Sequence, residues 1–275
     1  DTPLIAVDAL AARRPAPVLL DCSFDLADPA AGERAYAQGH LPGARYVHLD
    51  RDLSGPKTGS NGRHPLPSRD ACAAWMATMG IAPGRDVVVY DRQAGMFAVR
   101  AWWLLRWMGH ARVALLDGGH AAWVAAGHPE TSAVPPPAPV AILPPGPPAM
   151  PTIDAPTLLA ELHRVVLDAR APERHRGDVE PLDPVAGHIP GALNRFFKDN
   201  LQPDGRFKPA AQLRAEYTAL LGRDDAAGTV VSCGSGVTAC HDVLALEVAG
   251  LGTATLYPGS WSEWCADPAR PVARG

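Results

Sequence analysis

The sequence lacks any long apolar segment. No apolar run approaches the roughly 20 residues that a membrane-spanning helix requires. The first 12 residues also lack a basic stretch followed by an apolar one, so no signal peptide is expected. A removed leader stays open, because the chain does not begin with Met. The sequence therefore predicts a cytoplasmic protein without membrane association.

An excess of basic residues is absent as well. The 25 lysines and arginines are outnumbered by 29 aspartates and glutamates, which gives a formal net charge of -4. A protein that binds nucleic acid needs a basic surface to neutralise phosphates, so no nucleic-acid partner is expected. The hydrophobic fraction of 47% and the charged fraction of 20% are typical of a globular protein.

Cysteine is scarce and unpaired in its spacing. The five cysteines are scattered, with no Cys-x-x-Cys pair and no histidine at zinc-ligand spacing. An odd, scattered set argues against both a disulfide framework and a structural metal site. We expect no metal and interpret the cysteines as the reduced thiols of a cytoplasmic protein.

An internal repeat is the most informative feature that is present. Residues 39–45 read Gly-His-Leu-Pro-Gly-Ala-Arg and residues 187–193 read Gly-His-Ile-Pro-Gly-Ala-Leu. A short apolar run ending in Asp precedes each copy, at 18–21 and 165–168, and further apolar runs follow at 87–90 and 229–232. Matching parts in the same order predict a duplicated domain.

Proline separates the two copies. Residues 135–139 and 144–148 are so rich in proline that they exclude helix and favour an extended connector. We therefore predict a first domain over 1–128, a linker over 129–151 and a second domain over 152–275. Within each domain, short apolar runs alternate with helical patterns. This alternation predicts an α/β fold, in which a mainly parallel sheet is flanked by helices on both faces.

The helical patterns supply the expected core. One face carries Ala98, Trp102, Leu105 and Gly109, and another carries Leu213, Tyr217, Leu220 and Leu221. The tryptophans Trp102, Trp103 and Trp107 are predicted to be buried. His40 and His188 occur in both copies of the repeated motif, which predicts that they tie a turn by hydrogen bonds and have no catalytic role.

A glycine-rich loop carries the predicted chemistry. Residues 230–232 predict a buried strand and residues 238–249 a helix, and between them lie Cys233, Gly234, Ser235, Gly236 and Val237, followed by Thr238. Glycine lets such a loop curl so that successive N–H groups point inward, at the positive end of the helix. A thiolate at the start of this ring of donors would be stabilised and nucleophilic.

These residues resemble the tandem rhodanese family, and within it the 3-mercaptopyruvate sulfurtransferases. The resemblance rests on the duplication, the Gly-His-x-Pro-Gly-Ala motif, the loop after Cys233 and the Trp-Ser-Glu-Trp run at 261–264. It covers the whole chain. The resemblance implies two similar α/β domains of which only the second is catalytic. Asp91 stands at the nucleophile position of the first copy, where it cannot carry sulfur.

The resemblance also implies roles for further residues. Ser235 would act at the substrate thiol or carbonyl, together with His64 and Asp50 of the first domain. The substrate carboxylate would be bound by Arg174, with Arg176 as a second candidate. The loop residues Gly234, Gly236, Val237 and Thr238 would hold the transferred sulfur. A further arginine, expected after a Glu-Pro pair, is missing, because residues 180–183 read Glu-Pro-Leu-Asp.

The implied reaction transfers sulfur through a persulfide on Cys233. The donor is a small molecule, and the acceptor is a thiol, such as that of thioredoxin or glutathione, or cyanide. No metal or organic cofactor is needed. Residues 234–238 carry no charge, which favours 3-mercaptopyruvate over the thiosulfate dianion as donor. Thiosulfate is favoured instead if a basic residue from elsewhere in the chain reaches the loop.

Two other classes of protein share parts of this pattern. A cysteine phosphatase needs an arginine six positions after its cysteine, and that position is Ala239 here. A non-enzymatic regulatory module could be built from inactive copies, which suits the first copy but does not suit the intact loop at Cys233. Both alternatives are therefore less favoured than a sulfurtransferase.

Overall fold

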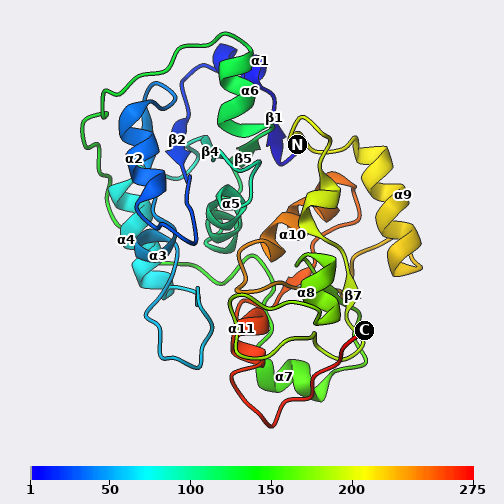
Figure 1. The fold of residues 1–275 in the computed structure, drawn as a ribbon. Helices are drawn as coiled ribbons and strands as arrows, with labels where there is room; N and C mark the ends of the chain where they lie inside the picture. Colours follow the sequence, from blue (N-terminus) through cyan, green and yellow to red (C-terminus); the bar gives the residue numbers. More distant parts are fainter. Residues whose placement is uncertain (1) are drawn as a thin grey trace. The chain divides into compact units, whose positions relative to one another are not determined.

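The chain folds into two compact units. The structure is a computed structural model that describes residues 2–275. The first unit comprises the chain up to Ser54, then Pro67–Met150 and Pro203–Arg206 (Figure 1). The second comprises Gly55–Leu66, Pro151–Gln202 and Phe207–Gly275. Each unit contains segments from both halves of the sequence, because Gly55–Leu66 belongs to the second unit and Pro203–Arg206 to the first.

The first unit is a parallel five-stranded sheet with helices. Its strands lie in the order β1-β5-β4-β2-β3 and every pairing is parallel. In chain order its elements are β1 (Leu4–Ile5), α1 (Val7–Ala12), β2 (Val18–Asp21), α2 (Ala31–Gln38), β3 (Ala44–Tyr46), α3 (Leu49–Asp52), α4 (Arg69–Thr78), β4 (Val87–Tyr90), α5 (Ala98–Trp107), β5 (Val113–Leu116) and α6 (Gly119–Ala125).

The second unit repeats this plan with a four-stranded parallel sheet. Its strands lie in the order β7-β6-β8-β9. Its elements are α7 (Ala155–Ala160), β6 (Val166–Asp168), α8 (Pro172–Arg176), β7 (Leu193–Asn194), a 3-10 helix η1 (Phe197–Asn200), α9 (Ala210–Leu221), β8 (Val230–Ser232), α10 (Ala239–Val248), β9 (Thr255–Leu256) and α11 (Ser260–Trp264).

The two sheets match strand for strand. β2, β3, β4 and β5 of the first unit correspond to β6, β7, β8 and β9 of the second, since both sets are ordered and paired in the same way. The two central strands, β4 and β8, are buried along their whole length. Strands covered on both faces read as continuous apolar runs. The predicted α/β fold with a parallel sheet in each copy is confirmed.

The core is more extensive than the helical periodicity predicts. Trp102 and Trp103 are fully buried and Trp107 is 8% exposed, which confirms their predicted burial. However, α5 buries nine of its ten residues, including Arg100, so it has no exposed face. A helix that is apolar nearly all round is enclosed on all sides. Over residues 2–275, no helix combines the length and apolar character needed to cross a membrane.

The proline-rich linker runs along the first unit. Residues 132–150 form neither helix nor strand. Backbone N–H groups of Val140 and Ala149 donate to Ala77 and Trp107 at 3.0 and 3.1 Å. The guanidinium of Arg69 donates to the carbonyl of Gly146 at 2.7 Å. These bonds fix an extended segment that makes no regular structure of its own.

A buried carboxyl group in α10 gives the second unit a pH-dependent stability. Asp242 is fully buried and accepts hydrogen bonds from Asn200 and Tyr217 at 2.7 and 3.2 Å. Burial outweighs these bonds and raises the pKa of Asp242 to about 7. Between the ordinary aspartate pKa of about 4 and pH 7, the folded state therefore holds a proton that the unfolded chain releases.

We expect this proton to make the folded second unit less stable as the pH rises from about 4 to 7. The Asp242 contribution to the free energy of unfolding should fall by up to about 1.4 kcal/mol per pH unit in that window. Urea unfolding of Asp242→Asn and wild type at several pH values measures this slope. Asp225→Asn, at an aspartate 55% exposed in the same unit, is the control. Equal slopes in Asp242→Asn and wild type would contradict the prediction.

Candidate active site

Hydrogen bonds to α11 hold the loop that begins at Cys233. The N–H of Cys233 donates to Ser260 Oγ at 3.0 Å, and its carbonyl accepts from the N–H of Trp261 at 2.9 Å. The carbonyl of Gly234 accepts from the N–H of Ser262 at 2.9 Å. Ser260 adopts a φ of 53°, a left-handed conformation that non-glycine residues rarely take. The loop start is thus fixed by backbone bonds that do not depend on the side chain of residue 233.

Backbone donors point at the sulfur. The N–H groups of Gly236 and Ser235 lie 3.1 and 3.4 Å from Cys233 Sγ. Cys233 is only 2% exposed. Gly236 has a φ of +77°, and a Cβ there would lie 2.2 Å from the carbonyl oxygen of Pro258. Only glycine allows the turn that aims these donors, which can stabilise a thiolate or a bound sulfur.

The rest of the loop leads directly into α10. Val237 is 4% exposed, and Thr238 is the residue before the helix begins at Ala239. α10 has ten residues, and its N-terminus, the positive end of the helix dipole, adjoins the donor loop. Cys240, seven positions after Cys233, is fully buried and donates to the carbonyl of Gly236 at 3.4 Å. Its packing agrees with a small apolar residue of the core.

A histidine from a distant part of the chain reaches the loop. His64 Nδ1 and Ser235 Oγ share a hydrogen bond of 2.8 Å, and both residues are buried. The sequence predicts that His64 belongs to the first domain, whereas its segment, Gly55–Leu66, packs within the second unit. Asp50, which was grouped with these two residues, lies on α3 of the first unit, where its N–H donates to His48 Nδ1 at 3.2 Å. The role of Asp50 stays a prediction.

Two arginines lie beside Gly234. A Cβ placed on Gly234 would be 2.8 Å from Arg63 Nη2 and 3.5 Å from Arg174 Nη1. Arg174 was expected near the substrate. Arg63 was not identified from the sequence, and only its position next to His64 could have pointed to it. The loop itself is neutral, but its surroundings include guanidinium groups from two other segments.

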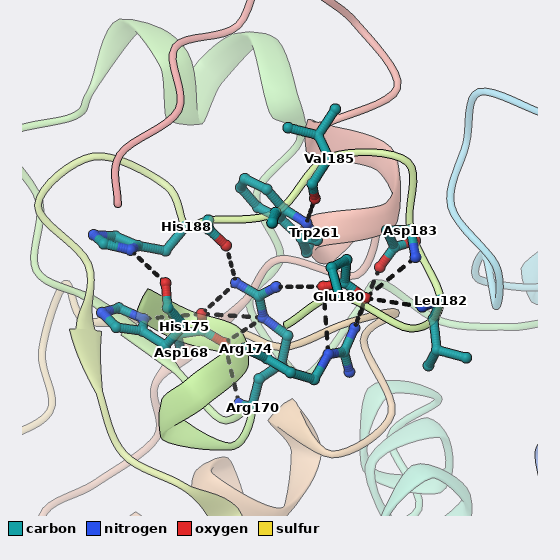
Figure 2. Close-up of polar contacts among 12 residues, drawn as sticks. Asp168, Arg170, Arg174, His175, Glu180, Leu182, Asp183, Val185, His188 and Trp261 are labelled. Atoms are coloured by element: carbon teal, nitrogen blue, oxygen red, sulfur yellow. Dashed lines mark hydrogen bonds and ion pairs between the residues drawn. The ribbon is translucent and has the colours of Figure 1, made fainter. Parts of the chain in front are cut away.

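Carboxylates pair with these arginines. Figure 2 shows Glu180 between Arg170 and Arg174, with Asp183 beside it. Glu180 Oε1 lies 2.7 Å from Arg174 Nη2, and Glu180 Oε2 lies 3.3 Å from Arg170 Nη1. Asp183 bridges two arginines, since one of its oxygens pairs with Arg63 and the other lies 3.4 Å from Arg174 Nη2. The arginines beside the loop are therefore balanced by buried acids.

A third buried acid anchors this network to the sheet. Asp168, at the end of β6, lies 2.7 Å from Arg170 Nη2 and 3.1 Å from His175 Nδ1 (Figure 2). Burial by itself raises the pKa of Asp168, but the His175 hydrogen bond and the Arg170 charge outweigh it and hold that pKa well below its ordinary value. The Arg170 guanidinium also lies 4.8 Å from the ring centre of Trp261, and the backbone N–H of Trp261 donates to the carbonyl of Cys233.

Arg176, the other arginine proposed from the sequence, lies apart from this cluster. It pairs with Asp178 at 2.8 Å and its side chain is 48% exposed. The histidines of the repeated motif tie turns, as predicted. His40 Nδ1 lies 2.8 Å from the carbonyl oxygen of Tyr36, and His188 Nδ1 lies 2.7 Å from that of His175.

The corresponding loop of the first unit has its donors occupied by its own side chain. The Asp91 carboxylate accepts four backbone hydrogen bonds at 2.8 Å, two on each oxygen, from Gln93, Gly95, Phe97 and Ala98. In both units, backbone N–H groups of the loop therefore point at the side chain of the residue that follows the central strand. In the first unit these donors bind the Asp91 side chain, whereas in the second the N–H groups of Ser235 and Gly236 face the sulfur of Cys233.

A duplicated parallel sheet, with a cysteine that faces backbone N–H groups after a central strand, defines a class of protein. The model of the rhodanese-like domain matches residues 6–126 and 154–267, so the chain belongs to the rhodanese-like family. The predicted tandem rhodanese fold is confirmed.

Particular relatives narrow the class. A Pseudomonas aeruginosa protein named as a probable 3-mercaptopyruvate sulfurtransferase is 49% identical, over 99% of this chain and 98% of its own. A Mycobacterium tuberculosis protein named as a candidate thiosulfate sulfurtransferase, SseB, is 45% identical, over 94% and 90%. The solved structure of the 3-mercaptopyruvate sulfurtransferase from Leishmania major matches with a TM-score of 0.83 at 30% identity, over 96% and 74%. The predicted sulfurtransferase class is confirmed.

Proposed function

We propose that this protein transfers a sulfane sulfur from 3-mercaptopyruvate to a thiol or to cyanide, through a persulfide on Cys233. The observation that carries the proposal is Cys233 Sγ facing the N–H groups of Ser235 and Gly236 at the end of β8. The 49% identity to a relative with that name supports the choice of donor.

The first half-reaction loads the cysteine. The Cys233 thiolate attacks the sulfur of the donor, and a sulfur–sulfur bond forms as the carbon–sulfur bond breaks. The electron pair of the broken bond leaves with carbon as the enolate of pyruvate. A proton then converts the enolate to pyruvate, and the hydrogen-bonded pair of Ser235 and His64 is suitably built to pass it. The backbone donors stabilise the charge on sulfur throughout.

The second half-reaction returns the enzyme to its sulfur-free state. A thiolate or cyanide attacks the outer sulfur of the persulfide and carries it away, which regenerates the Cys233 thiolate. This sequence of two half-reactions is ping-pong catalysis, and all bonds are made by protein, donor and acceptor. Thioredoxin, glutathione and cyanide remain proposed acceptors, and a cytoplasmic location remains a prediction.

Thiosulfate is the second candidate donor. Arg63 and Arg174 lie beside the neutral loop, and basic residues that reach the loop from elsewhere in the chain favour thiosulfate. The relative named as a candidate thiosulfate sulfurtransferase, at 45% identity, supports the same alternative. Against it, Asp183 and Glu180 pair with these arginines and reduce the positive charge offered to a dianion.

Parallel steady-state assays with the two donors test the proposal. We expect kcat/KM to be at least about tenfold higher with 3-mercaptopyruvate, because the carboxylates beside the loop disfavour a second negative charge. Mass spectrometry of the donor-treated enzyme should locate the added sulfur atom on the peptide that contains Cys233. A higher kcat/KM with thiosulfate would reverse the assignment of the donor.

A further inference from the structure

We propose that Arg63 is the second arginine of the donor site: together with Arg174 it binds the carboxylate of the donor beside Gly234, and Asp183 competes with the donor for both guanidinium groups. This inference rests on the proposed function, because it identifies the group that recognises the donor of that same reaction. It assigns a binding role to a residue on a segment remote from the loop in sequence.

The Arg63 side chain lies against the loop that carries Cys233. Its Nη2 lies against Gly234, the residue that follows the cysteine, at 2.8 Å from where a Cβ would stand. The next residue in the chain, His64, contacts Ser235 at 2.8 Å. One short segment thus brings a cation and a hydrogen-bonding ring to the same loop. A guanidinium beside the residue that follows Cys233 can pair with the carboxylate of a three-carbon donor whose sulfur meets Sγ.

The segment is anchored, so this placement does not depend on the ion pair alone. The N–H of Arg63 donates to Ser262 Oγ at 3.0 Å, and the N–H of Gly55 donates to the carbonyl of Pro65 at 2.8 Å. Gly62, with a φ of +85°, passes so close to the carbonyl of Gly259 that a Cβ would lie 2.9 Å from it. Backbone contacts therefore deliver the Arg63 side chain to the loop.

Donor capacity at Arg63 is not used up by the protein. Its side chain is 26% exposed, and within residues 2–275 its buried Nε has no hydrogen-bond acceptor. Arg174 is 17% exposed. By contrast, Arg170 is only 2% exposed and its guanidinium is bound by Asp168, Glu180 and the carbonyl of Gly187. Arg170 is structural, whereas Arg63 and Arg174 keep part of their surface for a ligand.

Charge balance gives Asp183 its role. Three arginines, at 63, 170 and 174, face three carboxylates, at 168, 180 and 183. Asp183 is 4% exposed and bridges the two arginines beside the loop, as a substrate carboxylate would. An arriving carboxylate shares these guanidinium groups with Asp183 or displaces it. Asp183 thus competes with the donor and weakens its binding.

The sequence around Asp183 lacks the arginine that the family resemblance implies there. Residues 180–183 read Glu-Pro-Leu-Asp, and the arginine expected after the Glu-Pro pair is absent. An acid, Asp183, stands close to that position, and an arginine from residue 63 faces it. The positive charge missing from one segment is supplied by another. Because a guanidinium binds a carboxylate through two parallel hydrogen bonds, lysine at 63 should substitute only in part.

The test is steady-state kinetics of Arg63→Gln with 3-mercaptopyruvate as donor and cyanide as fixed acceptor. We expect KM to rise roughly tenfold while kcat changes less than about threefold, because the carboxylate is bound equally in the ground state and the transition state. Pyruvate retains the carboxylate but has no sulfur, so its product-inhibition constant should rise by the same factor. Arg63→Lys should lie between Arg63→Gln and wild type.

Arg164→Gln is the matched control, since Arg164 is 24% exposed and paired with Glu161 in the same unit. Its KM should equal that of wild type. Asp183→Asn provides the opposite change: KM and the pyruvate inhibition constant should both fall by about threefold or more, because a competing carboxylate is removed. If Arg63→Gln does not fold, Asp183→Asn decides, and unchanged constants in that variant overturn the inference.

Failure of this inference is distinguishable from failure of the proposed function. An unchanged KM in Arg63→Gln, or a loss confined to kcat, overturns the role of Arg63 while Cys233→Ser remains inactive. Activity that persists in Cys233→Ser removes the proposed function itself. If the effect of Arg63→Gln appears only with thiosulfate, the site recognises a dianion, and the inference about the donor carboxylate is overturned.

Discussion

Cys233→Ser should abolish sulfur transfer with either donor, lowering kcat by roughly 10³-fold or more. The serine oxygen would accept hydrogen bonds from the same N–H groups, those of Ser235 and Gly236, so the loop should keep its shape. An oxygen cannot carry the sulfane sulfur as a persulfide. Cyanide-dependent thiocyanate formation measures the loss, and no sulfur should be added to the variant by mass spectrometry.

Cys265→Ser is the matched control for this substitution. Cys265 is buried in the same unit, and burial, with a smaller contribution from the Asp183 carboxylate, raises the pKa of its thiol. Such a thiol stays protonated at neutral pH and should not accept sulfur. Its variant is expected to retain wild-type kcat. Residual turnover in Cys233→Ser at the level of Cys265→Ser would contradict a persulfide on Cys233.

Ser235→Ala should lower kcat with 3-mercaptopyruvate by about 10²-fold, the usual contribution of a positioned proton donor. The leaving group from this donor is an enolate, which needs a proton on carbon. The sulfite released from thiosulfate is already a stable anion and needs none. Steady-state assays with both donors should therefore show a large loss with 3-mercaptopyruvate and a loss of less than about threefold with thiosulfate.

His64→Ala supplies the second arm of this experiment. His64 and Ser235 share one hydrogen bond, so they should act as a unit, and the double variant should lose little more than either single one. Losses that multiply in the double variant would show that the two residues act independently. Equal losses with both donors would instead indicate that the hydrogen bond between Ser235 and His64 shapes the loop.

The equivalence of the two sheets was predictable because the chain repeats itself. Apolar runs at equal positions of the two copies became β2 and β6, then β4 and β8, with the same neighbours in each sheet. Parallel strands joined by helices leave their loops at one edge, which placed residue 233 after a central strand. The repeat therefore indicated that the two sheets share one topology, and the structure supplied the order of their strands.

Burial of the helices was less predictable. Periodicity marked one face of α5, yet Arg100 is fully buried and nearly the whole helix is enclosed. Whether a mainly apolar helix is covered on one side or all round depends on what packs against it. The membership of Gly55–Leu66 in the second unit has the same origin: the family resemblance implied that His64 acts with Ser235, but only packing shows that the whole segment belongs to that unit.

The chemistry of the loop follows from its local sequence, because a cysteine followed by glycines and a helix start places backbone donors at the sulfur. It depends only on the φ freedom of Gly236 and on six consecutive residues. The charge around the loop depends instead on the fold. Arg63 and His64 lie about 170 positions before the residues they meet, and Asp183 pairs with an arginine 120 positions away. Electrostatic surroundings are set by distance in space, which a single sequence does not contain.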